Sequence, residues 1–412
     1  MPLLKKKTMI RRILTVFGGV MLLQISYGQS SLGDVNTLGQ QSYNVIQTPV
    51  PFLNIAPDSR AGAMGDAGVA TTPDINSMHW NAAKYAFIKD EFGFSTTYSP
   101  WLKKIAPDIR LLYLTGFYRL DKQSTVAAAI RYFALGDIIF TDAFNNFIRQ
   151  VNPNEFTIDA AYSRLFSDNL SGGIAFRFIR SDLAQGSSIN GEVTNAGIAF
   201  AADISMYYKK PLTVGGKGAE WTWGLNISNM GSKISYTDNA TKDFIPANLR
   251  IGTGFSFELD NYNKLNLELD LNKLLVPTPP IYKVDSGKYV LDSNGKQIIA
   301  KGLDPDVSTA QGMLQSFYDA PGGVSEELKE IMLSIGTEYW YRDQFAIRAG
   351  YFNESAMKGN RKYFTLGLGL KMTLLTLDFS YLVPAAGRDN PLANTMRFTA
   401  SVEFGKPKKQ TK

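Results

Sequence analysis

The sequence contains no cysteine and only one histidine among its 412 residues. The absence of cysteine excludes a disulfide scaffold, a thiolate zinc site and a cysteine nucleophile. A single histidine excludes a histidine cluster for a metal and leaves few candidates for a general base near neutral pH. Charged residues make up 19% of the chain and hydrophobic residues 44%, which is typical of a folded protein.

Long apolar runs and basic stripes are also missing. The mean hydropathy is −0.12, whereas a polytopic helical membrane protein needs repeated apolar runs of about 20 residues. No basic stripe with interleaved aromatics is present, so we expect no nucleic-acid partner. No nucleotide-binding motif stands out either, and we expect neither a cofactor nor a metal.

The first 28 residues have the pattern of a secretory signal peptide. Five basic residues come first: Lys5, Lys6, Lys7, Arg11 and Arg12. The apolar run over 13–25 that follows is too short to span a bilayer, and small residues flank Tyr27. We therefore expect a signal peptide over 1–28 with cleavage near Gly28/Gln29; the alternative is a buried N-terminal helix. Most of the formal charge of +6 lies in this segment.

From Glu91 onward the chain alternates between apolar and polar residues, which indicates strands. The clearest case sets Leu265, Leu267, Leu269 and Leu271 against Asn266, Glu268, Asp270 and Asn272. Fourteen such segments lie over 92–98, 110–119, 126–132, 156–163, 174–178, 198–206, 221–227, 248–259, 265–272, 329–341, 345–351, 363–370, 374–382 and 395–404.

The connections between these segments alternate in length. Short connections are expected over 120–124, 167–169, 261–264, 342–344 and 371–373. Long ones are expected over 99–109, 134–154, 181–192, 229–246, 274–327, 352–362 and 383–394, and 209–220 is a longer connection where a short one belongs. An even number of antiparallel strands with short turns at one end and long loops at the other predicts a bacterial outer-membrane β-barrel. The alternative is a secreted soluble all-β protein.

The polar face of the strands carries charges of both signs. These residues are Asp159, Arg177, Asp203, Arg250, Glu258, Glu268, Asp270, Arg348, Asp378, Arg397 and Glu403. They would be costly in a small dry core, so we expect a polar, partly hydrated lumen. Glu268 and Asp270 lie two residues apart, and we expect them to pair with Arg250 on the adjacent strand.

Four regions follow from this pattern: a signal peptide (1–28), a segment over 29–90, a fourteen-stranded barrel over 91–404, and a basic tail over 405–412. The segment over 29–90 is rich in Gly, Ala, Asn and Pro and does not alternate. Because a fourteen-stranded lumen is wide enough to need filling, we expect this segment to be a hatch inside the barrel. The alternative is a flexible periplasmic tail.

The hatch carries a sequence signature. It consists of Arg60, Gly62, Met64, Gly65, Gly68, Asp74, Trp80 and Asn81. This string resembles the N-terminal signature of the FadL-like outer-membrane barrels, in the Bacteroidetes branch that includes the PorV and PorQ families. The family pattern has Trp-Asn-Pro-Ala where this chain has Ala82 in place of proline. The entry over 54–62, the strand over 160–164 and the long loop after the ninth strand are most similar to the PorV family.

The resemblance implies a function without a reaction. It implies an outer-membrane component of the type IX secretion system, in a Gram-negative bacterium of the Bacteroidetes type. Such a protein is implied to bind the C-terminal signal domain of secreted cargo at the cell surface. Its implied partners are outer-membrane lipid, the giant translocon barrel, cargo signal domains and a surface attachment complex that includes a sortase-like protease.

The long loops supply the candidate partner-binding residues. These are Trp101, Ile138, Ile139, Phe140, Phe144, Phe147, Ile148, Ile281, Tyr282, Met313, Leu314, Phe317 and Tyr318. Apolar clusters in surface loops mark partner sites, although such side chains can also pack on one another to cap a barrel. Within the loop over 274–327, the segment 285–298 reads as a small hairpin with Asn294-Gly295 as its turn.

Two other functions are weighed against this one. A transporter of small hydrophobic molecules requires a continuous apolar tunnel from the loops to the hatch, and a charged lumen disfavours one. A lipid-modifying enzyme requires a serine with a histidine partner, and only His79 could supply the histidine. We expect His79 to be a packed or hydrogen-bonded hatch residue instead.

Overall fold

The computed structural model describes residues 44–102, 106, 108–141, 144–186, 188–189, 192–237, 242–385 and 395–405. The expected signal peptide, the first part of the expected hatch over 29–43 and the tail from residue 406 lie outside the described residues. In the part of the chain that the structure describes, no helix combines the length and apolar character needed to cross a membrane.

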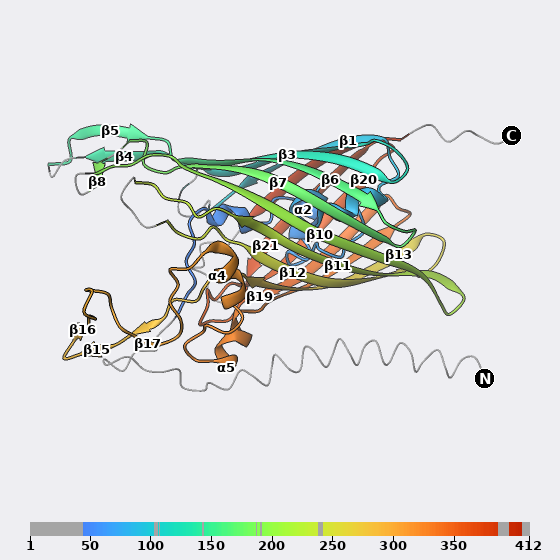
Figure 1. Cartoon of the computed structure of the whole chain (residues 1–412). Helices are drawn as coiled ribbons and strands as arrows, with labels where there is room; N and C mark the ends of the chain where they lie inside the picture. The colour runs from blue at the N-terminus through green and yellow to red at the C-terminus, as the bar shows by residue number, and fades with distance from the viewer. Residues whose placement is uncertain are drawn as a thin grey trace.

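Fourteen strands form one closed antiparallel barrel (Figure 1). In barrel order they are β1 (Phe92–Pro100), β2 (Ile109–Arg119), β3 (Ser124–Leu135), β6 (Asn154–Leu165), β7 (Leu170–Asp182), β10 (Gly197–Val214), β11 (Lys217–Gly231), β12 (Asn248–Glu258), β13 (Asn263–Leu274), β18 (Met332–Tyr341), β19 (Phe345–Asn353), β20 (Lys362–Lys371), β21 (Leu375–Pro384) and β22 (Met396–Phe404). β22 closes the barrel on β1, in a register that pairs Phe92 with Phe404. The predicted fourteen-stranded antiparallel barrel is confirmed.

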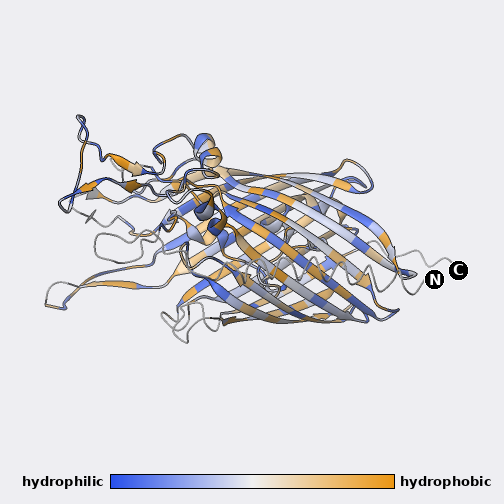
Figure 2. Cartoon of the chain, turned by 90° about the horizontal axis from the view of Figure 1, so that it is seen from below, coloured by the Kyte–Doolittle hydropathy of each residue, from blue (hydrophilic) through white to orange (hydrophobic). Residues whose placement is uncertain are grey.

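The strands present opposite chemistry to the two sides of the wall. In β13, Leu271 is exposed on the outside, whereas Glu268 and Asp270 are buried inside. The same alternation runs along the other strands (Figure 2), because successive side chains of a strand point to opposite faces. Nine of the eleven ionisable residues expected on the inner face are buried; Glu258 and Glu403, near the short turns, are exposed and half-buried.

Short turns gather at one end of the barrel and long loops at the other (Figure 1). In outer-membrane barrels the short turns face the periplasm and the long loops the exterior. The longer connection expected over 209–220 is wrong. β10 and β11 continue to a tight turn at Gly215 and Gly216, whose φ angles are +64° and +80°. Glycine adopts this backbone without a Cβ penalty, which allows the tight turn. The two strands therefore stay paired up to Val214 and Lys217, beyond the residues that alternate between apolar and polar.

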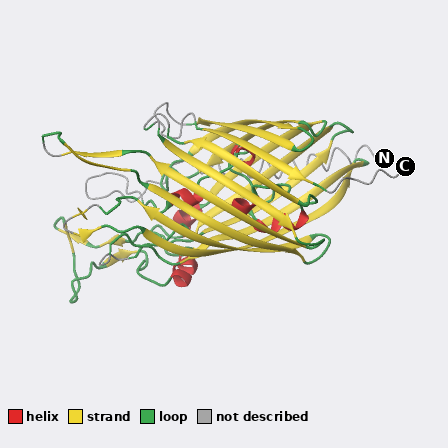
Figure 3. Ribbon diagram, turned by 90° about the horizontal axis from the view of Figure 1, so that it is seen from above, coloured by secondary structure: helices red, strands yellow, loops and turns green. Residues whose placement is uncertain are grey.

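The long loops contain short elements of their own (Figure 3). They are β4 (Ile138–Thr141), β5 (Phe147–Val151), β8 (Ser188–Ile189), β9 (Glu192–Val193), β14 (Ile281–Tyr282), β15 (Val284–Asp285), β16 (Lys288–Tyr289), β17 (Ile299–Lys301), α4 (Thr309–Gln315), α5 (Val324–Glu327) and η3 (Leu328–Glu330). The segment 285–298 contains two turns instead of one hairpin turn: β15 and β16 pair around the first, and a Leu291–Gln297 bridge encloses the second, which includes Gly295.

The segment before β1 lies inside the barrel. Its elements are η1 (Pro51–Asn54), α2 (Ser59–Gly62), α3 (Ser77–Trp80) and η2 (Ala82–Phe87). Most of its side chains between Ala56 and Ala86 are buried, and its backbone bonds to inward-facing strand residues, for example from Ser59 N to Thr399 Oγ1 at 2.9 Å. We call residues 44–91 the hatch segment from here on.

Candidate functional site

The hatch segment folds through short helices with side-chain caps. Asp58 begins α2 and accepts a hydrogen bond from Ala61 N at 3.0 Å, which satisfies one of the free donors at a helix start. Its other carboxylate oxygen accepts the indole hydrogen of Trp80 at 2.6 Å. Asn81 caps η2 by accepting from Ala83 N, and its amide donates to Val69 O and to Met206 O of β10. These bonds join the two halves of the hatch segment to each other and to the wall.

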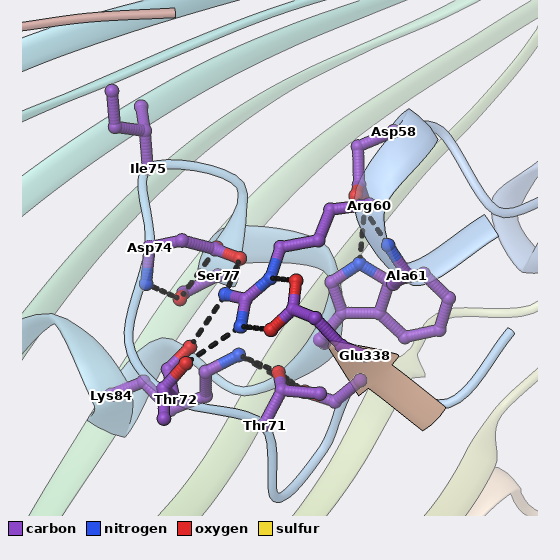
Figure 4. Close-up of polar contacts among 12 residues, drawn as sticks. Asp58, Arg60, Ala61, Thr71, Thr72, Asp74, Ile75, Ser77, Lys84 and Glu338 are labelled. Carbon is purple, nitrogen blue, oxygen red and sulfur yellow. Dashed lines mark hydrogen bonds and ion pairs between the residues drawn. The ribbon is translucent and has the colours of Figure 1, made fainter. Parts of the chain in front are cut away.

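Arg60 is the central charge of the hatch segment (Figure 4). Its guanidinium donates two bonds to Glu338 of β18, at 3.0 and 2.8 Å, and one to Asp74 at 2.8 Å. Glu338 also accepts from Arg348 of β19 at 2.7 Å, and Arg348 pairs with Asp378 of β21 at 2.7 Å. A continuous line of alternating charges therefore anchors the hatch segment to three strands.

Glycines allow the hatch segment to lie directly against the wall. A Cβ at Gly65, whose φ is +68°, would lie 2.6 Å from backbone atoms of Tyr351. A Cβ at Gly68 would lie 2.3 Å from the ring of Trp80. Gly62 gives room to the guanidinium of Arg397, and Met64 lies against Gly336 and Gly350. All eight residues of the sequence signature thus lie in the packed hatch, where they contact one another or the strands.

His79 lies between two arginines. Its Nδ1 is 2.8 Å from Arg131 Nη2, and its Nε2 is 3.3 Å from Arg250 Nη2. The ring also packs edge-on against Trp80 at 4.6 Å between centroids. Both ring nitrogens therefore face guanidinium groups, an arrangement that suits a packed, hydrogen-bonded histidine.

Arg250 makes no described hydrogen bond or ion pair with Glu268 or Asp270, although its charge still interacts with that of Asp270. Arg250 donates to His79 O at 3.1 Å and lies over the Trp80 ring at 4.9 Å. Asp270 instead accepts from the backbone N–H groups of Gly68 and Val69, at 2.7 and 2.9 Å. The hatch segment explains the difference, because its backbone offers donors to the wall carboxylate and its carbonyls offer acceptors to the wall arginine.

The packed hatch leaves a polar cavity at the short-turn end of the lumen. The cavity has a volume of about 990 Å³, and Arg60, Asp74, Glu220, Lys264, Arg348 and Asp378 are among its lining residues. A second cavity of about 40 Å³ lies beside Trp80, Arg250 and Tyr363. Both linings mix polar and apolar side chains: Phe257 and Trp340 line the first cavity beside its charged groups, and Met332 and Phe352 line the second.

The β4–β5 hairpin presents apolar side chains at the opposite end. Its exposed residues are Ile138, Ile139, Phe140, Phe144, Phe147 and Ile148. The hairpin forms a separate two-stranded sheet, so each strand has an edge with no described strand beside it. Arg149 steadies it by lying over the Phe140 ring at 5.5 Å and donating to Ala184 O at 2.9 Å.

The loop between β13 and β18 forms a second apolar surface. Leu314, Phe317 and Tyr318 are exposed in and just after α4, whereas Met313 and the β14 residues Ile281 and Tyr282 are half-buried. Sequence reasoning missed two further exposed residues of this surface, Val324 and Leu328. They belong to α5 and η3, whose short helical turns break the alternating pattern.

A buried charge cluster holds this loop on the barrel rim. Lys273 of β13 pairs with Glu330 and with Glu327, the latter at 3.0 Å, and Lys358 pairs with Glu330 at 2.9 Å and Glu326 at 2.6 Å. Burial opposes ionisation of Glu330, but hydrogen bonds from Lys273, Thr278 and Lys358 outweigh it and hold the Glu330 pKa below its usual value. Alternation did not reveal this cluster, because it joins the end of β13 to residues from two separate loops.

Asp319 lies in the same loop. It accepts from Thr278 N at 3.1 Å through one oxygen, while its other oxygen is buried without a hydrogen-bond partner among the described residues. Burial raises the pKa of Asp319 to about 6.

Trp101 differs from the other candidate partner-binding residues, and its expected place on the loop surface is wrong. It is 9% exposed and packs in a core cluster with Val50, Phe52 and Leu53 of the hatch segment. The Arg397 guanidinium lies 5.8 Å from its ring centre. The residue directly follows β1, so its ring turns into the barrel mouth.

No group of three His, Cys, Asp or Glu side chains suited to a metal ion occurs within the described ranges.

Comparisons with known proteins place the chain in a family. The model of the family described as "Type IX secretion system protein PorV" matches residues 38–281. A search of the curated proteins found no significant match.

Three solved barrels illustrate the structural likeness. The toluene transporter TodX of Pseudomonas putida is 11% identical, with coverage of 88% of this chain and 99% of that chain and a TM-score of 0.47. The deltaS2S3 mutant of the TodX monoaromatic hydrocarbon channel is 11% identical, with coverage of 84% and 97% and a TM-score of 0.48. The CymD monoaromatic hydrocarbon channel is 12% identical, with coverage of 89% and 100% and a TM-score of 0.45.

Proposed function

Because this chain belongs to the PorV family of type IX secretion system proteins, we propose that its extracellular loop face binds the C-terminal signal domain of secreted cargo. We define the loop face as the β4–β5 hairpin together with residues 309–330. In this proposal the barrel receives cargo from the translocon and delivers it to the attachment complex with its sortase-like protease. No reaction is involved, and the barrel acts by capture and handover.

One observation carries the proposal: beyond the outward face of the barrel strands, the loop face carries a group of exposed apolar side chains, while the lumen is filled and charged. Phe147 is 67% exposed and Leu314 is 68% exposed. Both side chains lie in loops, so they contact water unless a partner covers them. Large exposed apolar groups in one region mark interaction sites. β4 and β5 each have an edge with no described strand beside it, and in this proposal these edges add backbone hydrogen bonds to a β-rich signal domain.

Transport of small hydrophobic molecules is the alternative. The chains similar in structure include a protein named as a toluene transporter. Against this function here, the Arg60–Glu338–Arg348–Asp378 line of charges joins the hatch to one side of the wall, and ionisable groups are among the lining residues of the cavity at the short-turn end. An apolar molecule that passes through this part of the lumen would meet charged side chains, with which it makes no favourable contacts.

Substitution in the hairpin tests the proposal. Ile139→Asp and Phe147→Asp place charges on exposed positions of β4 and β5, and Leu120→Asp places the same charge on an exposed position at the short-turn end. Each variant is expressed in cells, cross-linked at the surface and purified, and proteins that carry the signal domain are quantified. We expect the two hairpin variants to recover at least tenfold less cargo than Leu120→Asp.

Folding must be checked for each variant by the altered gel mobility of the unheated barrel. Equal cargo recovery from folded hairpin variants and the Leu120→Asp control would refute the role of the hairpin. Uptake of a hydrophobic compound into vesicles that contain the purified protein, with no cargo recovered from cells, would favour the transporter.

A further inference from the structure

The outward face of the barrel wall is hollowed over β1, β2 and β3. This groove has a volume of about 670 Å³, and Gly116 and Ala128 are among its lining residues. Gly116 of β2 pairs with Ala128 of β3, which in turn pairs with Ala160 of β6. Three small residues therefore lie side by side on adjacent strands, and we call this feature the wall groove.

Large apolar side chains border the wall groove. In the strand register, Phe94 lies beside Gly116 and Phe176 lies beside Ala160. The rows before and after the small residues carry the exposed side chains of Leu114, Ile130, Tyr118 and Tyr162. The pairing from β1 to β6 runs without a register shift, so the wall is closed beneath the groove, which does not lead into the lumen.

The position of the wall groove restricts its occupant. Outward strand residues of a membrane barrel face hydrocarbon, so whatever fills the groove must be apolar. The side chains around a hollow lose dispersion contacts unless an occupant fits against them. A flexible apolar chain can follow the shape of the groove and restore those contacts.

Two cations lie where the wall groove meets the short turns (Figure 1). Arg164 is exposed on the outward face of β6, two residues beyond Tyr162, and Lys122 is exposed in the β2–β3 turn. Asp121 in the same turn offsets part of this charge, although its Oδ1 accepts from Gln123 N and Ser124 N at 2.6 and 2.8 Å. Across the two turns, over 119–123 and 164–169, three basic residues stand against two acidic ones. The end of the groove therefore favours an anion.

We propose that the wall groove holds one acyl chain of a phospholipid from the leaflet next to the short turns, with the phosphate beside Arg164 and Lys122. A phospholipid supplies an apolar chain and an anion in the same order along the membrane normal as the groove and the two cations. Basic side chains near the ends of membrane-spanning segments extend to the headgroups. Tyr118 and Tyr162 lie between the groove and the cations, at the level where aromatic rings prefer the membrane interface. The inference stands whether or not the loops bind cargo.

A phosphatidylethanolamine with a photoreactive diazirine at the end of one acyl chain tests this assignment. The purified barrel in detergent is titrated with the lipid and irradiated, and mass spectrometry locates the adducts on the strands. Ala128→Phe fills the groove, and Ala349→Phe, at an outward position of β19, is the matched control. Arg164→Gln removes one cation and leaves the groove unchanged. Folding is checked by the gel mobility of the unheated barrel, and Ala128→Leu replaces Ala128→Phe if the latter does not fold.

We expect the adducts to be concentrated on β2 and β3. Ala128→Phe should lower them about tenfold relative to Ala349→Phe, because a blocked groove excludes about two methylene groups. Arg164→Gln should raise the lipid concentration that gives half of the adducts about threefold, as for the loss of an exposed charge contact. Equal adducts in the two phenylalanine variants, or adducts spread evenly over all strands, would overturn the groove. An unchanged half-saturation in Arg164→Gln would overturn the placement of the phosphate.

The same position distinguishes a lipid from a protein occupant. Because the chain has no native cysteine, Ala128→Cys carries a single thiol-linked photoreactive probe in native membranes. Adducts with phospholipid support the proposal. Adducts with another membrane protein in place of lipid would assign the groove to a partner and overturn it.

Discussion

Replacing Arg60 with alanine should loosen the hatch segment strongly. The guanidinium makes five hydrogen bonds to Glu338, Asp74 and Thr72, and Glu338 is fully buried. Removal of one partner from a buried ion pair costs about 3–5 kcal/mol, because the remaining charge stays desolvated. Arg348 still contacts Glu338 in the variant, so we expect the cost to lie near the lower end of this range, about 3 kcal/mol.

Substitution of Arg60 by lysine distinguishes the contribution of the positive charge from that of the guanidinium geometry. Arg60→Lys keeps the positive charge but loses the planar fork that binds both oxygens of Glu338, so we expect an intermediate loss. Arg180→Ala is the matched control, because Arg180 pairs with Asp182 at 2.9 Å with 36% of its side chain exposed. Exposed ion pairs contribute only about 0–1 kcal/mol.

The assay is equilibrium unfolding in denaturant, with the protein held in detergent micelles or lipid vesicles. A double-mutant cycle with Glu338→Ala measures the coupling between Arg60 and Glu338, which we expect to exceed about 1 kcal/mol for residues in direct contact. A free energy of unfolding for Arg60→Ala within about 1 kcal/mol of that for Arg180→Ala, together with no coupling, would show that the line of charges does not anchor the hatch.

Three further predictions concern single contacts of the hatch and loops. Gly68→Ala should destabilise the barrel by about 1–3 kcal/mol in the same assay, because the added Cβ would lie 2.3 Å from Trp80; an unchanged stability would mean that the ring shifts freely. Asp270→Ala should cost about 1–3 kcal/mol, because it removes the carboxylate oxygen that accepts two hatch N–H groups, and hydrogen exchange of those amides should rise. For Asp319, a folded pKa of about 6 against an ordinary value of 3.8 means that the folded loop binds the proton more tightly. Its contribution should therefore stabilise the loop as pH falls through 6 and be lost as pH rises; hydrogen exchange over 275–331 should show this pH dependence in the native chain, and Asp319→Asn should remove it.

The barrel was predictable because alternation is a local signal. Each strand needs only its own residues to show which face is apolar, as in β13, where leucines alternate with polar residues. The β10–β11 turn was within reach too, because Gly215-Gly216 is a recognised hairpin signal. Pro211 and the lysines before it interrupt the apolar pattern there, and strands that extend past the membrane no longer need to alternate.

The contacts of the hatch were not predictable in the same way. Arg60 and Glu338 are 278 residues apart in the sequence, and no local pattern shows which wall residue an inner charge will meet. The direct hydrogen-bond partners of Arg250 were missed for this reason: the expected partners were on the adjacent strand, whereas the hatch supplied closer ones. Trp101 was misplaced because a loop position next to a strand end can face either the exterior or the barrel mouth.

A filled lumen also bears on how capture and handover can work. Buried ion pairs hold the hatch in place, and binding of cargo at the loop face does not require the barrel to open. The free energy of binding is therefore not spent on moving buried charges. In the proposed handover, each transfer runs toward the partner that binds cargo more tightly. A tenfold difference in affinity requires only about 1.4 kcal/mol. A few exposed apolar side chains can supply a modest affinity of this kind, whereas a deep apolar pocket would hold cargo too tightly for the next partner to take it. An accessible hairpin on a rigid barrel is therefore better suited to transient binding than a cavity would be.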